Sequence, residues 1–219
     1  MDVVGWPEIF RGSDAVRAGL VTWARLHGPG FARVYPDTWV ARDMLPLDVR
    51  GRCRAVFRWT RGRGAIAGWA AAELSGASCA PRGVPVEVAM PVRSRAPDGV
   101  RIRRESLHAG EIEWRHGVRV TTPLRTVFDL ARLPDETAAV VAVDALARVH
   151  GFHPDLLLNF AVRYAGLRGV GRTAHHEPGE FAIAHVVCHS AGIQSCGTQD
   201  GVRFSPNARI PSWPSAEAK

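Results

Sequence analysis

The chain has almost no lysine, since Lys219 is the only one although lysine and arginine together number 28. Its formal net charge of +7 and its sequence pI of about 10.2 therefore come almost wholly from arginine. Two explanations fit this bias. In the first, arginine is selected because guanidinium groups bind phosphates and bases bidentately. In the second, a GC-rich genome encodes arginine in place of lysine without any functional reason. The charge by itself does not establish a nucleic-acid ligand.

Paired cysteines and long apolar runs are also missing. The four cysteines form no CxxC pair and no dense disulfide pattern, so reduced thiols are expected (Cys53, Cys79, Cys188 and Cys196). No segment approaches the ~18 apolar residues that a membrane span requires. The N-terminus MDVVGWPEIF lacks the basic and apolar regions of a signal peptide. These absences predict a soluble cytoplasmic protein without a membrane partner.

The motifs of common enzymes are absent as well. The sequence has no GxSxG, GxxxxGK(S/T) or HExxH, and no GxGxxG after a strand. A restriction-type nuclease needs clustered carboxylates and normally a lysine in a (D/E)xK arrangement. Glu111 and Glu113 have the acidic part of that pattern without the lysine, and we interpret them as surface carboxylates on a β-turn. We expect no catalytic residue, no metal, no cofactor and no enzymatic activity.

The most informative segment extends from Val118 to Arg132. Its alternating valines predict a short strand, and Thr122 with Pro123 predicts the N-cap and first position of a helix. Four apolar residues follow at helical spacing, namely Leu124, Val127, Phe128 and Ala131. Arg125 and Asp129 lie one turn apart on the flank of this stripe. We expect them to form a partly solvated ion pair worth about 0.3–0.5 kcal/mol.

The spelling TTPLRTVFDLA in this segment resembles the hallmark of actinobacterial proteins related to the AbiEi-type antitoxins of type IV toxin–antitoxin systems. GWAAAELSGA, VEVAMP and GVRIRR precede it in the family's order, so the resemblance extends from about Phe10 to Arg172. It implies a DNA-binding regulator of its own promoter. The implied partners are DNA and a cognate toxin or nucleotidyltransferase-like protein. Longer members continue into a nuclease-like domain related to very-short-patch-repair endonucleases, which is not found in this sequence.

Residues 1–45 are predicted to form a small winged helix-turn-helix-like segment. Ser13 and Asp14 are expected to cap a first helix, Thr22 a second, and a hairpin is predicted over residues 31–40. The family resemblance implies that this segment binds DNA. The residues expected to face DNA are Thr22, Trp23, Arg25 and His27 on the second helix, and Arg33 and Tyr35 on the wing. Because no third helix is predicted before Ser13, a helical hairpin covering the next domain remains the alternative.

Residues 46–172 are predicted to form an α+β body, with a mixed sheet of about four strands between residues 86 and 120. A buried helix is expected over residues 66–74, and another from Asp135 to His150 with Val141, Ala145 and Val149 on one face. Six arginines between residues 50 and 63 are interleaved with aromatic residues. Arg52 and Arg54 are expected to add phosphate contacts. The alternative is a solvated helix whose aromatic side chains pack inward.

Composition changes near residue 173, because no leucine follows Leu167 and histidines crowd in. Residues 173–219 are predicted to be a disordered tail. His185, Cys188, His189 and Cys196 have the ligand types that zinc prefers, but their spacing matches no standard finger, so no metal site is predicted. Two functions are left: a non-enzymatic DNA-binding antitoxin-like regulator, or the truncated or frameshifted remnant of a nuclease-fusion protein.

Overall fold

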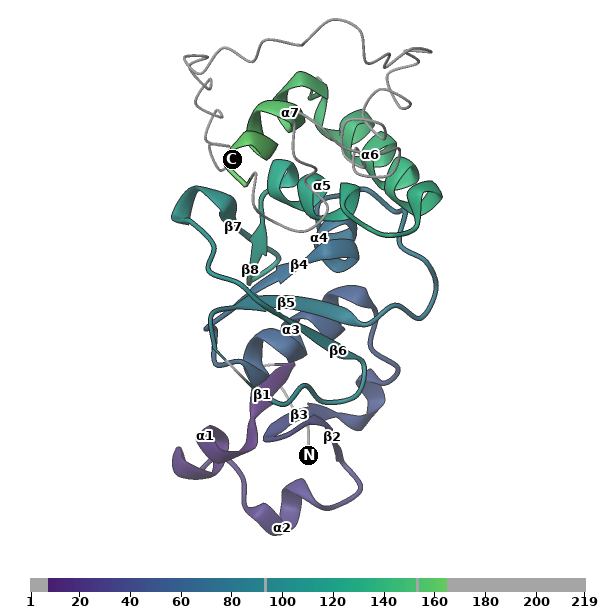
Figure 1. Ribbon diagram of the computed structural model, residues 1–219. Helices are drawn as coiled ribbons and strands as arrows, with labels where there is room; N and C mark the ends of the chain where they lie inside the picture. Colours follow the sequence, from purple (N-terminus) through teal and green to yellow (C-terminus); the bar gives the residue numbers. More distant parts are fainter. Residues whose placement is uncertain (1–7, 93, 153, 165–219) are drawn as a thin grey trace, which may run out of the picture.

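The computed structural model describes residues 8–92, 94–152 and 154–164. These residues form an α+β protein, as predicted, in which a small N-terminal sheet, a larger mixed sheet and a group of helices follow one another along the long axis (Figure 1). The four candidate zinc ligands from His185 to Cys196 lie outside the described residues. No helix in the described ranges is long and apolar enough to cross a membrane.

The N-terminal unit is a three-stranded antiparallel sheet with two short helices. Its strands lie in the order β1-β3-β2, with β1 at Ile9–Arg11, β2 at Phe31–Tyr35 and β3 at Thr38–Ala41. Helices α1 (Gly12–Arg17) and α2 (Trp23–Leu26) connect β1 to β2. The two predicted helices and the predicted hairpin are present. Strand β1 was not predicted, because three residues are too few to show a period.

The turn of the hairpin is anchored to the start of α1. The carboxylate of Asp37 accepts hydrogen bonds from the backbone nitrogen and hydroxyl of Ser13, at 2.7 and 2.6 Å, and from the Arg11 guanidinium. Asp37 has a φ of 57°, in the left-handed region that Asp tolerates better than most residues. The prediction that Ser13 and Asp14 cap α1 was therefore wrong. The hairpin turn supplies the missing hydrogen-bond acceptor instead.

Helix α3 (Val49–Trp59) lies between the two sheets and packs against both. Ala55 contacts Ile9 and Val40 of the small sheet, whereas Cys53 and Val56 belong to the core of the larger sheet. Burial raises the pKa of the Cys53 thiol to about 12, as suits a structural cysteine. The short 3₁₀ helix η1 (Arg42–Met44) precedes α3. Helix α3 therefore joins the N-terminal unit to the body.

The body contains a five-stranded mixed sheet in the order β6-β5-β4-β8-β7. The strands are β4 (Ala65–Ala67), β5 (Val86–Met90), β6 (Val100–Arg104), β7 (Ile112–Arg115) and β8 (Val118–Thr121). The prediction of about four strands missed β4, the central one, which was assigned to the following helix. Gly68 has a φ of 58° and lets the chain turn from β4 directly into α4 (Gly68–Leu74).

Three helices cover the end of the body: α5 (Pro123–Ala131), α6 (Glu136–His150) and α7 (Pro154–Val162). Thr122 and Asp135 cap α5 and α6 as predicted, and Gly151, with a φ of 62°, ends α6. The face of α6 that packs on α5 is formed by Ala139, Ala142, Val143 and Leu146. Val141 and Val149 are each 48% exposed, so the face singled out from the sequence is not the packing face.

Candidate functional site

Arg125, on the first turn of α5, lies at the centre of a buried group of charges. The hydroxyl oxygen of Thr122 accepts the backbone N–H of Arg125 at 3.4 Å and so fixes the start of this helix. The guanidinium donates from Nε to Oδ2 of Asp129 and from Nη1 to Oε1 of Glu111, both at 3.1 Å. Its Nη2 donates to Glu105. One planar guanidinium therefore donates hydrogen bonds to three carboxylates that lie in different directions.

Two further arginines reach the same carboxylates. Arg103 on β6 donates to Asp129 at 2.8 Å and to Glu105 at 3.1 Å, and Arg132 donates to Asp129 at 2.8 Å. Tyr164 donates its hydroxyl to Glu111. We call these residues the charge cluster: Arg103, Glu105, Glu111, Arg125, Asp129, Arg132 and Tyr164. Its three guanidiniums face three carboxylates, so it is balanced in charge without a ligand.

Tyr164 closes the charge cluster where α7 ends. The guanidinium carbon of Arg125 lies 5.1 Å from the centre of the Tyr164 ring and 5.6 Å from that of Phe128, within cation–π distance. Burial and the hydrogen bond to Glu111 together raise the pKa of Tyr164 to about 12. The phenol is therefore a neutral donor at ordinary pH. It ties the last described helix to the strand-helix junction.

The groups of the charge cluster hold one another in the charged state. Burial alone raises the pKa of Asp129, but Arg103 and Arg125 together bring it below its usual value. Burial alone lowers the pKa of Arg125, and the same pairing with Asp129 raises it. Neither group titrates near neutral pH, so neither is suited to act as a general acid or base. Among the described residues, no group of three or more His, Cys, Asp or Glu can hold a metal ion.

Two sequence predictions are corrected by this geometry. The expected partly solvated pair of Arg125 and Asp129 is buried, with side chains 0% and 1% exposed. Glu111 was interpreted as a surface carboxylate, but its side chain is 6% exposed. Glu113, the other acid of the pair singled out from the sequence, is half-buried at the surface and pairs with Arg115. The charge cluster is therefore a structural centre of the body.

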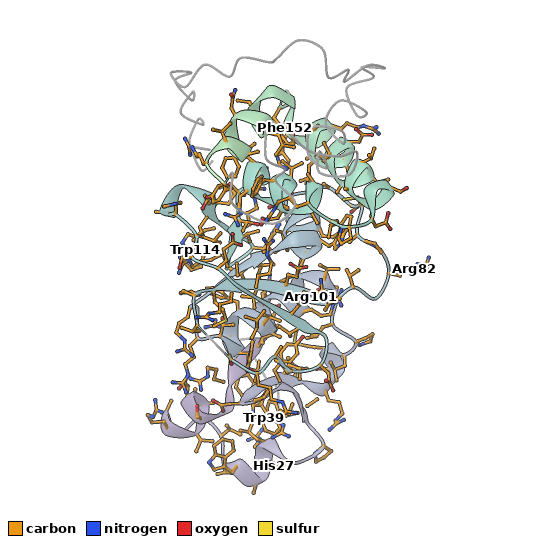
Figure 2. The ribbon with its side chains drawn as sticks, viewed as in Figure 1. His27, Trp39, Arg82, Arg101, Trp114 and Phe152 are labelled. Atoms are coloured by element: carbon orange, nitrogen blue, oxygen red, sulfur yellow. The ribbon has the colours of Figure 1, made fainter. Side chains whose placement is uncertain are left out.

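The N-terminal unit places four predicted DNA-facing residues on or beside α2. Thr22 caps α2, since its hydroxyl oxygen accepts the backbone N–H of Arg25 at 3.2 Å. Trp23 is 47% exposed and Arg25 is exposed. The ring of His27 lies 5.2 Å from that of Trp39, and Figure 2 shows both at the N-terminal end of the molecule. His27 Nδ1 also lies 2.8 Å from the Trp23 carbonyl oxygen.

The other four predicted DNA contacts are spread over β2 and α3. Arg33 is exposed on β2, whereas Tyr35 is half-buried between the small sheet and the body. The Arg52 guanidinium donates to the Val84 carbonyl oxygen at 3.5 Å. Arg54 donates to Glu8 at 2.6 Å and to the His116 carbonyl oxygen at 3.3 Å. Arg33 alone of these four combines exposure with no side-chain hydrogen bond within the described ranges.

A surface groove of about 750 Å³ lies between the N-terminal unit and the body. Its lining includes Phe10, Ala15, Leu20, Phe57, Arg58 and Trp114. Two of its apolar side chains are unusually open to solvent, with Leu20 57% exposed and Trp114 68% exposed. Trp114 stands at the edge of the molecule, on the side opposite Arg82, in Figure 2. This groove could not be predicted from the sequence, because its lining comes from β1, α1, α3, β7 and β8, which are distant along the chain.

Comparison with known proteins identifies the class of the body. Residues 65–180 match the family model described as the AbiEi antitoxin C-terminal domain. The match covers more than half of the 219 residues, and the chain belongs to this family. No curated protein and no solved structure matches the chain. Family membership supports an antitoxin role in a toxin–antitoxin system and implies a cognate toxin as partner.

Proposed function

We propose that this antitoxin is a non-enzymatic DNA-binding protein that regulates its own promoter through the N-terminal unit. The observation that supports DNA binding most is the exposed face of α2. Trp23 and Arg25 project from a helix that is capped by Thr22 and backed by the sheet β1-β3-β2. A helix held through its buried Leu26, with an aromatic and a basic side chain exposed on its two flanks, can present both side chains to a DNA groove.

The position of α2 favours this role. It lies at the N-terminal end of the long axis, so DNA can approach it without meeting the body (Figure 1). Four residues of helix extend only ~6 Å, which fits easily within the ~12 Å width of the major groove. Arg33 on the neighbouring strand β2 is exposed and supplies a second cation for the phosphate backbone. The short helix limits the number of bases that it can read.

The hairpin turn cannot extend far from the unit, because Asp37 binds it to α1. We therefore assign the principal DNA contacts to Trp23, Arg25 and Arg33. Thr22 and His27 hold the form of α2, and Tyr35 positions β2 on the body. Arg52 and Arg54 lie on α3 and can only be auxiliary contacts, since both already bind other parts of the chain.

The test is binding of the full chain to labelled duplexes that cover the region upstream of its gene. Arg25→Ala and Arg33→Ala should each weaken binding, whereas Arg82→Ala should not, because Arg82 is equally cationic but exposed on a loop of the body. Binding is measured by fluorescence anisotropy at low salt. Failure of the unaltered protein to bind any of these duplexes would overturn the proposal.

The remnant of a nuclease-fusion protein remains a second proposal. It is supported by the change in composition after Leu167. Translation of the other two reading frames downstream of codon 172 tests it. A coding sequence for a domain with clustered carboxylates in one of those frames would support a frameshifted remnant, and its absence would reject the frameshift.

A further inference from the structure

Trp114 on β7 is 68% exposed, more than any other large apolar side chain in the part of the chain that the structure describes. Phe57 on α3 holds the indole by an edge-to-face contact, with the ring centres 5.7 Å apart. The surface groove between the N-terminal unit and the body opens beside it, with Phe10 and Ala15 in the lining. An indole that is fixed in position and still open to solvent presents a flat apolar surface to a ligand.

Three arginines share the lining of the groove with Trp114. Arg119 on β8 is the cross-strand partner of Trp114, so the two side chains lie on the same face of the sheet. Arg58 directly follows Phe57 on α3, and Arg61 comes just after the end of that helix. All three arginines line the groove. One open indole and three cations therefore meet in one site.

Most of this positive charge is left for a ligand. Arg58 and Arg61 are exposed, and within the described ranges neither guanidinium forms an ion pair. Arg119 donates to the Gly62 carbonyl oxygen at the long distance of 3.5 Å. The acid in the lining, Asp14, already pairs with two other arginines, at 3.5 and 3.4 Å. The groove is therefore complementary in charge to an anion.

Arg61 occupies a backbone position that usually belongs to glycine. Helix α3 ends in a Schellman motif, in which the Gly62 N–H donates to the Phe57 carbonyl oxygen at 3.0 Å. The Arg61 N–H donates to the Arg58 carbonyl oxygen, also at 3.0 Å, and Arg61 has a φ of 57°. This left-handed conformation is unfavourable for a side chain as large as arginine, so the turn itself does not account for the residue. The cost favours a role for the guanidinium outside the turn.

We propose that this groove binds single-stranded nucleic acid, with one base stacked on Trp114 and the neighbouring phosphates bound by the three arginines. A nucleotide joins a flat ring to an anion, which matches an open indole beside guanidiniums. The bases of a duplex stack on one another, so only an unpaired base can lie on the indole. The net charge of +7 favours a polyanion over a short acidic peptide. The proposal does not depend on duplex binding by α2.

The experiment compares two fluorescein-labelled strands of about 12 nucleotides on the full chain. One is oligothymidine, and the other has the same phosphates and sugars but no bases. Fluorescence anisotropy at low salt measures both affinities. We expect oligothymidine to bind about tenfold more tightly, the effect of one stacked base.

Substitutions of tryptophan show where that base stacks. Trp114→Ala should bind the two strands equally, because only the phosphate contacts remain. Trp114→Phe should keep most of the tenfold difference, since a phenyl ring also stacks on a base. The matched control is Trp23→Ala on α2, because Trp23 is the other exposed tryptophan of the described chain. This variant should keep the whole difference.

The salt dependence of oligothymidine binding tests the arginines. Arg58→Ala and Arg61→Gly should each reduce the slope of log affinity against log salt by about 0.7, the contribution of one phosphate contact on a single strand. Arg61→Gly should not lower the thermal midpoint, because glycine fits the left-handed turn. Weaker binding without a loss of stability separates a ligand contact from a structural role. Arg82→Ala, on an exposed loop of the body, should change neither quantity.

Several results would overturn the proposal for the groove. One is no binding of oligothymidine at low salt, and another is equal affinity of the unaltered chain for the two strands. Loss of the difference in Trp23→Ala but not in Trp114→Ala would assign base stacking to α2. Displacement of oligothymidine by an equal concentration of thymidine monophosphate would assign the groove to a free nucleotide. Displacement by an acidic amphipathic peptide would assign it to a protein.

Discussion

Arg125 and Glu111 are fourteen residues apart in the sequence, yet Nη1 of Arg125 donates to Oε1 of Glu111 at 3.1 Å with both side chains buried. Glu111 ends the 3₁₀ helix η2 (Ala109–Glu111), which leads into β7, and Arg125 lies on the first turn of the helix that follows β8. The pair therefore closes the β7–β8 hairpin against α5. Since Tyr164 binds the same carboxylate, this contact also reaches the end of α7.

Arg125→Ala should lower the free energy of unfolding by about 3–5 kcal/mol, because it leaves several buried carboxylates without a partner. Arg125→Lys should also lower the free energy of unfolding, since an ammonium group cannot donate to Glu105, Glu111 and Asp129 with the planar geometry of a guanidinium. Urea denaturation measures both. The exposed control Arg82→Ala should change stability by less than about 0.5 kcal/mol. A loss below about 1 kcal/mol for Arg125→Ala would mean that the charge cluster is not a structural centre.

Stability should fall in acid because of Asp129. Its pKa lies below the usual value, so the unfolded state takes up this proton first. The stabilisation is fully present above the unfolded carboxyl pKa of about 3.9 and is lost as the pH falls from there through the folded pKa. Asp129→Asn should lower stability at pH 7 and make its decline below about pH 4 shallower. The exposed control Asp43→Asn should leave the decline unchanged.

The chain has two tyrosines, whose ionisation can be followed by phenolate absorbance in the folded protein. Burial raises the pKa of Tyr35, and burial with the Glu111 hydrogen bond raises that of Tyr164 to about 12. The corresponding stabilisation is present below the unfolded pKa of about 10 and is lost as the pH rises above it. Phenolate absorbance of the folded protein should therefore rise at higher pH than that of the unfolded chain. A full titration of one tyrosine at pH 10 in the folded state would contradict the placement of its ring.

Asp37→Ala should loosen the N-terminal unit more than the body. It removes the acceptor for the backbone nitrogen and the hydroxyl of Ser13 and one of the two carboxylates that pair with Arg11, and it places alanine at a left-handed φ. We expect a loss of about 1–2 kcal/mol, comparable to the loss of a helix cap. Hydrogen exchange should accelerate at the Ser13 amide and along α1. Unchanged protection there, compared with Asp43→Ala as control, would show that the turn does not anchor α1.

Features encoded within a few residues could be predicted from the sequence. Thr122 with Pro123 marks the start of α5, and Asp135 and Gly151 mark the two ends of α6. Each of these end signals acts through a contact that spans at most four residues. Strand β4 was missed because its three residues Ala65–Ala67 run into α4 without a break in apolar character. The packing face of α6 was missed because alanines are less hydrophobic than valines and so mark a buried face less clearly in the sequence. Their small side chains allow the close approach to α5.

The charge cluster could not be read from the sequence. Arg125 and Asp129 show the spacing of an ordinary surface pair, and their burial depends on Arg103, Glu111 and Tyr164, which are far away along the chain. Charged residues are buried only when paired in this way, so their burial follows from the tertiary fold and not from local pattern. The same holds for the groove, because its two most exposed apolar residues, Leu20 and Trp114, are far apart along the chain.

The salt dependence of affinity for the upstream duplex tests the proposal for α2 most directly. A protein that neutralises several phosphates must lose affinity steeply with salt, and each arginine that contacts a phosphate contributes about one unit to the slope. We predict a steep slope for the unaltered chain, a slope smaller by about one for Arg33→Ala, and no change for Arg82→Ala. A flat response, or the same slope in all three proteins, would contradict DNA binding through the N-terminal unit.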